Sequence, residues 1–485
     1  MRYNRSILIA LFTSLILSFL HCPLFEIFFD DKEIFKYTGQ AISKGEIPYQ
    51  DFFDHKPPLI FFINFLGQLI GNWGLWIIDM TLVFFTTIIF FNICTRYKML
   101  YAWLLPCIFN FMIRNHTVSV GIGMTREYTA IFTLLFFCMM LGSSRYKFYI
   151  LGLLTGLIFF TQQDQVIPLL PFLLYSILTE VINLANLLKR IAVLTAGYLS
   201  IVSTILFYFL IKNSLSLLWQ DAFVFNFNWY NESMSLLQHL KAIGTALHYT
   251  EYDTIFYGTI ILAIAALILG SNKSSLLLAC IIAVILSFCS EFLSGKLIMG
   301  LPVYYYFLPL SVTIPATLFV VYAFTRKLFD FNSAHYLIYS AILSANLIYH
   351  MLQYAGNLPT EEKWIKSQAE FKFLKSHGLK DRSLFVFNNS SYIYLYNELN
   401  ILSPSPWLYH YFWNWYPNWD PDNKKLETII SDLVKYKTTY ILDFTVTDTL
   451  KYNNNQKFWE SFLHNRYTLQ NIQPIEVKGR LWKIK

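Results

Sequence analysis

The chain contains a succession of apolar stretches, many of them about as long as the hydrocarbon core of a bilayer is thick. A helix that spans this core needs ~20 mainly apolar residues. Hydrophobic residues make up 55% of the 485 positions, and charged residues only 14%. These values lie outside the usual range of soluble domains. The sequence therefore predicts an α-helical, multi-pass membrane protein.

Basic residues in the short connections predict the orientation of the chain, because cytoplasmic loops are enriched in Lys and Arg. If Arg2 and Arg5 keep the N-terminus in the cytoplasm, the other basic clusters between spans fall on the same side. The first helix is expected to be uncleaved, and the short apolar run after Pro58 to lie at the membrane interface. About eleven spans result: 6–22, 73–95, 100–113, 127–142, 148–161, 166–182, 191–211, 254–269, 276–292, 304–324 and 336–354.

Two domains are predicted. Residues 1–355 form the transmembrane domain, with outside loops at 23–72, 114–127, 212–253 and 293–303. Residues 356–485 contain more charge and no run long enough to span, which predicts a small extracytoplasmic α/β domain. Its expected strands are 383–388, 438–443 and 476–484, and its expected amphipathic helices are 424–436 and 457–463.

The distribution of charge and the spacing of the cysteines argue against nucleic-acid binding, a zinc site and a disulfide framework. The net charge of +7 is dispersed in small groups, without the single basic face that nucleic-acid binding requires. The six cysteines lack the spacing of a zinc site or of a disulfide framework.

Acidic residues are concentrated in the first outside loop. Asp30 and Asp31 follow the first span directly, at the surface where the headgroup of a lipid-linked substrate is presented. A carboxylate in this position suits a general base, although an isolated loop acid is more often simply solvated. Tyr37, His55 and Lys56 follow before two prolines, whose fixed φ angles stiffen the chain.

This loop, "DDKEIFKYTGQAISKGEIPYQDFFDHKPPL", resembles the first-loop signature of the GT-C glycosyltransferases. The bacterial branch in question includes aminoarabinose transferases, Rgt-type sugar transferases and protein-mannosyltransferase relatives (glycosyltransferase family 39-like). The order of an Asp, an aromatic residue and a Tyr, then Gly, Pro-Tyr, Asp and Lys-Pro carries the resemblance. The matching residues are Asp31, Phe35, Tyr37, Gly45, Pro48, Tyr49, Asp51, Asp54, His55, Lys56 and Pro58.

Two later loops carry weaker similarity. Glu127 in "GIGMTREYTAIF" takes the place of the acidic residue before a returning helix, although Arg126 and Glu127 are equally suited to capping that helix. In "GKLIMGLPVYYYFLPL", Tyr305 stands where relatives often have His, and Lys296 supplies a basic group. Gln162 ends the fifth span on the outside, where a contact with the donor headgroup and plain solvation are both open.

The resemblance implies an inverting glycosyltransferase that moves a sugar from a polyprenyl-phosphate donor to a glycan, lipid or protein acceptor. The reaction is expected at the outer face of the bacterial inner membrane. The catalytic candidates are Asp31 as base, Asp30 as second choice and Glu127. The substrate-binding candidates are Tyr37, His55, Lys56, Arg126, Gln162, Lys296 and Tyr305, of which Lys56, Arg126 and Lys296 suit the lipid phosphate.

No cofactor is required by the sequence. Some relatives use a divalent cation between loop acids, and Asp31 with Glu127 could supply its oxygen ligands. Three alternatives remain open: an oligosaccharide polymerase or ligase, a lipid-sugar flippase or other permease, and a member of the family without activity. A permease is expected to keep polar groups inside its spans near the midplane, and this chain has few.

Overall fold

The computed structural model divides the chain into two compact units, which we describe separately. Unit 1 comprises residues 1–25, 73–209 and 231–356, and unit 2 comprises 26–72, 210–230 and 357–485. The residues that the structure describes are 2–19, 21–25, 30–99, 101–114, 122–179, 183–230, 237, 253–268, 274–293, 310–325, 369–408, 424–444, 454–470 and 479–485.

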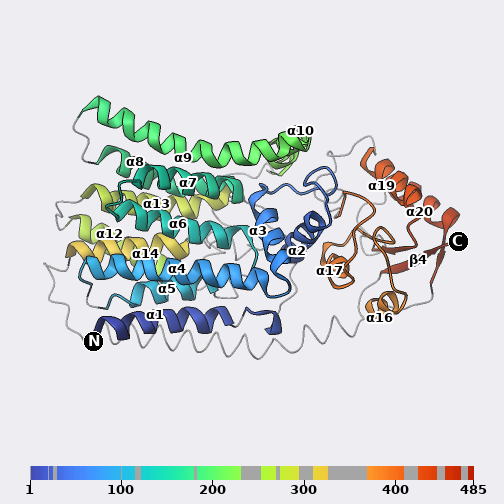
Figure 1. The fold of residues 1–485 in the computed structure, drawn as a ribbon, viewed down its shortest axis with the longest axis horizontal. Coiled ribbons are helices and arrows are strands. Elements are labelled where there is room, and N and C mark those ends of the chain that lie inside the picture. The colour runs from blue at the N-terminus through green and yellow to red at the C-terminus, as the bar shows by residue number, and fades with distance from the viewer. Residues whose placement is uncertain are drawn as a thin grey trace. The chain divides into compact units, whose positions relative to one another are not determined.

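Unit 1 is built from helices that lie roughly parallel to one another (Figure 1). The helices are α1 (Arg2–Phe19), α4 (Gly74–Arg96), α5 (Leu104–Arg114), α6 (Thr125–Leu141), α7 (Lys147–Thr161), the 3₁₀ segment η2 (Gln163–Leu169), α8 (Leu170–Leu178), α9 (Leu184–Ile211), α12 (Asp253–Ile268), α13 (Ser274–Leu293) and α14 (Leu310–Thr325). Some consecutive helices pack against each other, such as α6 with α7 and α13 with α14, and so do helices further apart in the chain, such as α1 with α4.

Helix α7 packs against α9 through two glycines. A Cβ atom on Gly152 would lie 2.0 Å from the carbonyl oxygen of Leu194, and one on Gly197 would lie 2.1 Å from that of Tyr149. Only glycine allows the two backbones to approach so closely. Small residues at helix crossings are typical of membrane proteins, where tight van der Waals packing drives association.

The helices agree in position with the predicted spans. Ten of the eleven predicted spans overlap a helix, and the eleventh, 336–354, lies outside the described residues. In the described part, α4 and α9 are long and apolar enough to cross a membrane by length and composition alone. The other apolar helices have described apolar segments of 10–17 residues, so the number of spans stays a prediction.

Unit 2 joins the first predicted outside loop to two later parts of the chain. The loop is largely helical, because it contains α2 (Asp30–Ser43) and α3 (Leu59–Ile70), which pack against each other. Residues 210–230 contribute α10 (Leu215–Trp219) and two π-helical segments, η3 (Gln220–Val224) and η4 (Asn226–Tyr230). The compact units therefore differ from the predicted two-domain division, which placed residues 23–72 with the transmembrane domain.

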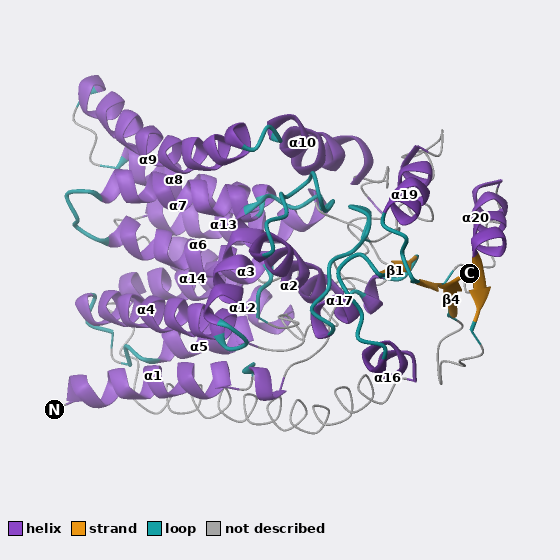
Figure 2. Ribbon diagram, turned by 45° about the vertical axis from the view of Figure 1, so that its right-hand side comes forward, coloured by secondary structure: helices purple, strands orange, loops and turns teal. Residues whose placement is uncertain are grey.

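The C-terminal part of unit 2 contains a four-stranded mixed sheet, drawn in orange in Figure 2. Its strand order is β1-β2-β4-β3, with β1 and β2 parallel and the other pairs antiparallel. The elements are β1 (Leu384–Phe387), β2 (Tyr440–Asp443), β3 (Tyr467–Leu469), β4 (Arg480–Ile484), α16 (Ala369–Ser376), η6 (Ser390–Tyr392), α17 (Tyr394–Glu398), α19 (Lys424–Lys435) and α20 (Asn454–Arg466).

The core of this part forms where α19 and α20 cover the sheet. Leu426, Ile429 and Leu433 repeat at helical spacing on α19 and are buried in one cluster with Phe387 and Trp459. The rings of the last two stack with centroids 4.0 Å apart. The three predicted strands and both amphipathic helices are therefore present, within a few residues of the expected bounds. The short elements β3, α16 and α17 were not predicted.

Candidate functional site

The predicted site residues fall in both compact units. Unit 2 contains Asp30, Asp31, Tyr37, His55 and Lys56, whereas unit 1 contains Arg126, Glu127 and Gln162. Two further candidates, Lys296 and Tyr305, lie outside the described residues. The geometry of each group is given below within its own unit.

Asp30 and Asp31 open helix α2. Asp30 is the first residue of the helix and Asp31 the second, and the Asp31 side chain is partly exposed. Carboxylates are favoured in the first turn because the backbone N–H groups there give the helix a positive end. Glu33, two positions later, is buried and accepts a hydrogen bond of 2.6 Å from Asn397 Nδ2. Glu33 therefore contacts the C-terminal part of unit 2, while Asp31 keeps access to solvent.

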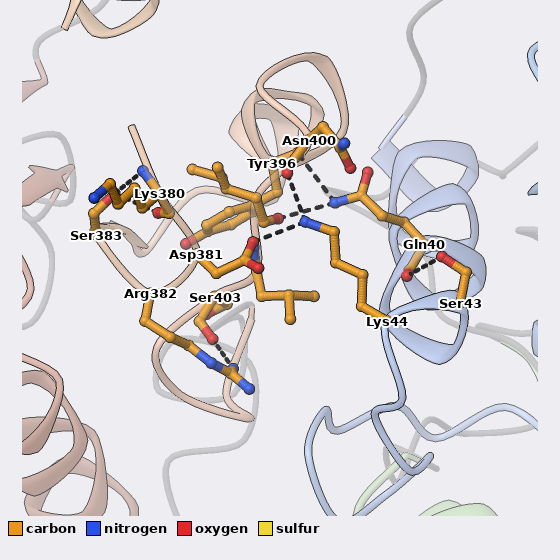
Figure 3. Close-up of polar contacts among 12 residues, drawn as sticks. Gln40, Ser43, Lys44, Lys380, Asp381, Arg382, Ser383, Tyr396, Asn400 and Ser403 are labelled. Carbon is orange, nitrogen blue, oxygen red and sulfur yellow. Dashed lines mark hydrogen bonds and ion pairs between the residues drawn. The ribbon is translucent and has the colours of Figure 1, made fainter. Parts of the chain in front are cut away.

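One stripe of α2 binds the C-terminal part of unit 2 through polar side chains at helical spacing (Figure 3). Gln40 donates from Nε2 to the carbonyl oxygens of Tyr396 (3.2 Å) and Ile401 (2.9 Å). One turn later, Lys44 Nζ pairs with Asp381 at 2.8 Å and also donates to a backbone carbonyl. These contacts fix α2 against residues 381–403.

Tyr37 lies on the same stripe and is fully buried. Its hydroxyl oxygen accepts a hydrogen bond of 2.9 Å from the Ser403 amide, and its ring lies 5.4 Å from that of Tyr396. Burial raises the pKa of Tyr37 well above its usual value. The phenol is thus a neutral group that orders the junction between α2 and the C-terminal part. Its predicted contact with substrate stays a prediction.

The segment that carries His55 and Lys56 is held by hydrogen bonds to its backbone. Asp54 Oδ1 accepts from the Lys56 amide at 2.8 Å, and the Tyr49 hydroxyl donates to the Lys56 carbonyl at 2.7 Å. From another part of the chain, Asn226 Nδ2 donates to the His55 carbonyl at 2.7 Å. The backbone of the predicted phosphate-binding lysine is therefore fixed by contacts on both of its neighbouring peptide groups.

The His55 side chain is mostly enclosed. Its Nδ1 lies 3.8 Å from Asp54 Oδ1, and its ring lies 5.8 Å from the Phe225 ring. Only 15% of the imidazole is exposed. We therefore expect this histidine to be oriented by its neighbours, so that a small solvent-facing part of the ring remains for other contacts.

Asp221 is a further acid near this segment, and the sequence analysis did not select it. Burial, with a smaller contribution from the charge of Asp54, raises its pKa to about 7, while the nearby Lys425 ammonium acts in the opposite direction. Asp221 and Asn226 both lie in "QDAFVFNFNWY", where polar residues interrupt an aromatic run. That interruption was the available signal, because a polar side chain in such a segment needs a partner.

In unit 1, three predicted residues meet where α6 begins and α7 ends. Glu127 is buried in the first turn of α6, where its Oε2 accepts a hydrogen bond of 3.1 Å from the Gly123 amide. Thr125 Oγ1 donates to Gln162 Oε1 at 2.9 Å, which links the start of α6 to the residue that follows α7. Arg126 is also buried. Glu127 thus lies in the first turn of α6, where the helix dipole favours a carboxylate, and its hydrogen bond comes from an amide that precedes the helix.

Gln162 belongs to a small polar group with its neighbours on η2. Asp164 Oδ2 accepts hydrogen bonds from Gln165 Nε2 at 2.7 Å and, at the longer distance of 3.4 Å, from Gln162 Nε2. The structure thus places amide and carboxylate groups together at this end of the helices.

Asp79 is a buried acid within α4, and the sequence analysis missed it. Its side chain is completely buried in a helix of otherwise apolar character. Ionisable residues within membrane spans are rare, and by default they indicate a functional or partnered site. The single Asp in "GLWIIDMTLVFF" was a sufficient signal.

Metal binding was expected only as an option, with Asp31 and Glu127 as ligands. Among the residues that the structure describes, no group of three or more His, Cys, Asp or Glu side chains is arranged to hold a metal ion. Asp31 and Glu127 belong to different units.

The chain has a fold similar to that of a solved aminoarabinose transferase, which agrees with the fold that the first-loop resemblance implied. The apo crystal structure of ArnT from Cupriavidus metallidurans matches 99% of this chain and 98% of its own, with 10% sequence identity and a TM-score of 0.60. A crystal structure of the same protein bound to undecaprenyl phosphate matches 70% of this chain and 63% of its own, with 13% identity and a TM-score of 0.48.

Comparisons of the sequence alone gave no match. No protein-family model matches the chain, and no curated protein matches it. At 10% identity the likeness to ArnT shows a shared fold, and function must be argued from the site.

Proposed function

We propose that the protein is a membrane glycosyltransferase that transfers a sugar from a polyprenyl-phosphate donor to an acceptor outside the cytoplasm. The observation that supports this most is the fold shared with ArnT over 99% of the chain, together with the first-loop residues that resemble the GT-C pattern. The acid, the tyrosine and the His-Lys pair of that pattern occupy one helix and one hydrogen-bonded turn in unit 2. A folded and partly buried loop is what a binding site requires.

The proposed base is Asp31. Its carboxylate is partly exposed at the start of α2, whereas Glu33 is buried and bonded to Asn397. The donor phosphate is a good leaving group, so the enzyme chiefly needs a base for the acceptor hydroxyl and positive charge for the released phosphate. One base acting in a direct displacement inverts the anomeric centre. Asp30 is the second choice for the same role.

The proposed cationic groups are Lys56, Arg126 and Lys296, with Tyr37, His55, Gln162 and Tyr305 as further substrate-binding candidates. Lys56 is supported best, because hydrogen bonds on both sides of its peptide unit fix its backbone. A preorganised charge stabilises a developing anion without reorganisation during the reaction.

We further propose a multi-pass protein of the bacterial inner membrane, with its N-terminus in the cytoplasm and residues 356–485 outside. The basic clusters between predicted spans support this orientation. The proposed acceptor is a glycan, a lipid or a protein, and a divalent cation with Asp31 and Glu127 as ligands stays an option of the proposal.

Complementation of a deletion strain tests the proposal. Mass spectrometry of its glycolipids and surface glycans should show the loss of one glycosylated species, which the wild-type gene restores. Asp31→Asn should reduce that species by a factor of about 10² or more, the usual contribution of a general base. Glu127→Gln tests the second acid, and the exposed Glu427→Gln is the matched control. Full restoration by Asp31→Asn at equal expression would refute the assignment of the base.

A further inference from the structure

Residues 215–230 form a helical segment with one buried and one exposed side. Leu218, Ala222 and Phe225 are buried, and Phe225 packs against the first loop with its ring 5.4 Å from that of Phe53. On the other side, Trp219 is 61% and Phe227 is 78% exposed. The exposed side is aromatic, which is unusual for a surface that faces water.

The helical geometry of this segment keeps the exposed aromatic residues together. The Trp219 and Phe223 rings stack with centroids 5.3 Å apart and an angle of 26° between their planes. Residues 220–224 and 226–230 have π-helical hydrogen bonding. Side chains four positions apart lie on the same side of a helical segment. Trp219, Phe223 and Phe227 are spaced in this way. Π-helical turns are rare, and they occur frequently at functional sites.

Helix α9, which precedes this segment in the chain, indicates what lies against the exposed aromatic side. Helix α9 has 28 residues, is apolar enough to span a membrane, and has only 17% of its most apolar window buried within the protein. Its final residues Leu210 and Ile211 are 59% and 61% exposed. Only Lys212 to Ser214 separate α9 from α10. An exposed apolar helix that is followed by a segment with exposed Trp and Phe side chains is typical of the bilayer interface.

We propose that residues 215–230 lie at the extracytoplasmic membrane surface, with Trp219, Phe223 and Phe227 in contact with lipid. The opposite side of this segment then acts as a positioning element for the first loop. Asn226 holds the His55 carbonyl, and Phe225 packs against the His55 ring. The bilayer thereby fixes the height of the His55–Lys56 turn, so that Lys56 meets a lipid phosphate at headgroup level. This last step rests on the proposed function, whereas the membrane contact does not.

Fluorescence quenching in proteoliposomes of the full-length protein tests the membrane contact. An environment-sensitive dye is attached to the cysteine introduced by Phe227→Cys. The matched control carries the same dye on Glu427→Cys, at an exposed polar position of α19. Of the six native cysteines, five are buried, and the labelled wild type corrects for any background. Nitroxide-bearing lipid should quench the Phe227 label and shift its emission to the blue, while aqueous iodide should quench the Glu427 label.

Two results would overturn the membrane contact. Quenching of the Phe227 label by iodide and not by nitroxide lipid would place it in water. Protection from both quenchers would mean that protein, such as a second copy of the chain, covers this side. Neither readout depends on activity, so failure here is distinguishable from failure of the proposed function.

The positioning role has its own test, hydrogen exchange of the peptide that contains His55 and Lys56. Asn226→Ala removes the hydrogen bond to the His55 carbonyl, and also one to the Ala222 carbonyl within its own segment. The loss at His55 is about 1.4 kcal/mol or less, so local exchange of the His55–Lys56 peptide should become up to ~10-fold faster. The exposed Gln220→Ala, in the same segment, should leave exchange unchanged. Equal exchange in the wild type and Asn226→Ala would refute the positioning role, whatever the activity of either variant.

Discussion

The amide of Gln40 provides the most direct test of how α2 is held in unit 2. The side chain is buried and donates from Nε2 to two backbone carbonyls, those of Tyr396 and Ile401. In Gln40→Ala, the Tyr396 oxygen keeps the hydrogen bond that it accepts from the Ile401 amide, but the Ile401 oxygen loses its side-chain donor. Two lost hydrogen bonds, each worth about 1 kcal/mol, give about 2 kcal/mol of local destabilisation.

A local destabilisation of this size corresponds to a measurable increase in the rate of amide hydrogen exchange. If the C-terminal part separates from α2 by local opening, 2 kcal/mol makes amide exchange over residues 394–402 ~30-fold faster. Hydrogen exchange read by mass spectrometry on the purified protein measures this directly. The exposed Gln50→Ala is the matched control, since Gln50 lies in the same loop. Unchanged exchange in Gln40→Ala would refute the inference that this side chain secures the junction.

Two further outcomes are expected. Because the folded-state pKa of Asp221 is raised from 3.8 to about 7, the folded protein binds a proton that the unfolded chain releases, so stability falls as pH rises across this window. The thermal midpoint of the wild type should therefore fall relative to Asp221→Asn between pH 5 and pH 8, and parallel profiles would contradict this. Gly39→Ala places a Cβ atom 2.6 Å from the Asn64 carbonyl carbon, so we expect a loss of about 1–3 kcal/mol from overpacking. Gly258→Ala, which has open space around it, is the thermal-unfolding control, and an equal effect in both variants would contradict the clash.

The positions of the helices in unit 1 could be predicted because the helices lie in long apolar runs of the sequence. Apolar runs and basic connections are local signals, and nearly every predicted span overlaps a helix. Helix–helix packing was not predictable in the same way. The approach of Gly152 to Leu194 joins residues 42 positions apart, and a glycine in an apolar run gives no indication of its partner.

Unit 2 was the least predictable part of the fold. Its junction joins residues that are far apart in the sequence, such as Gln40 and Ile401, which are 361 positions apart. Nevertheless a usable signal was present in α2. Glu33, Tyr37, Gln40 and Lys44 recur at intervals of three or four residues, the spacing of one helix face. Once the loop is recognised as a helix, this polar stripe predicts a protein partner.

The role of a candidate site residue could not be predicted from its identity alone. The first-loop pattern selected Asp31, His55 and Lys56, but it could not show that Tyr37 bonds to the Ser403 amide. A tyrosine that binds substrate and one that orders a helix junction look the same in a sequence, because burial depends on distant residues. Asn226 and Asp221 were missed although polar residues interrupt an aromatic run at these positions.

The contacts of α2 bear on the part that residues 369–408 play in the proposed reaction. Glu33, Tyr37 and Gln40 are buried through contacts with this segment, and each has a hydrogen-bonding group that needs a partner when it is buried. The other side of α2 packs on α3, with Gly39 against Asn64. A helix held on two sides has little freedom to rotate or slide. The direction in which the Asp31 side chain projects from α2 is therefore determined both by the first loop and by a segment more than 300 residues away in the chain. It follows that substitutions in residues 381–403 should alter the placement of the proposed base even though they lie in a different predicted domain.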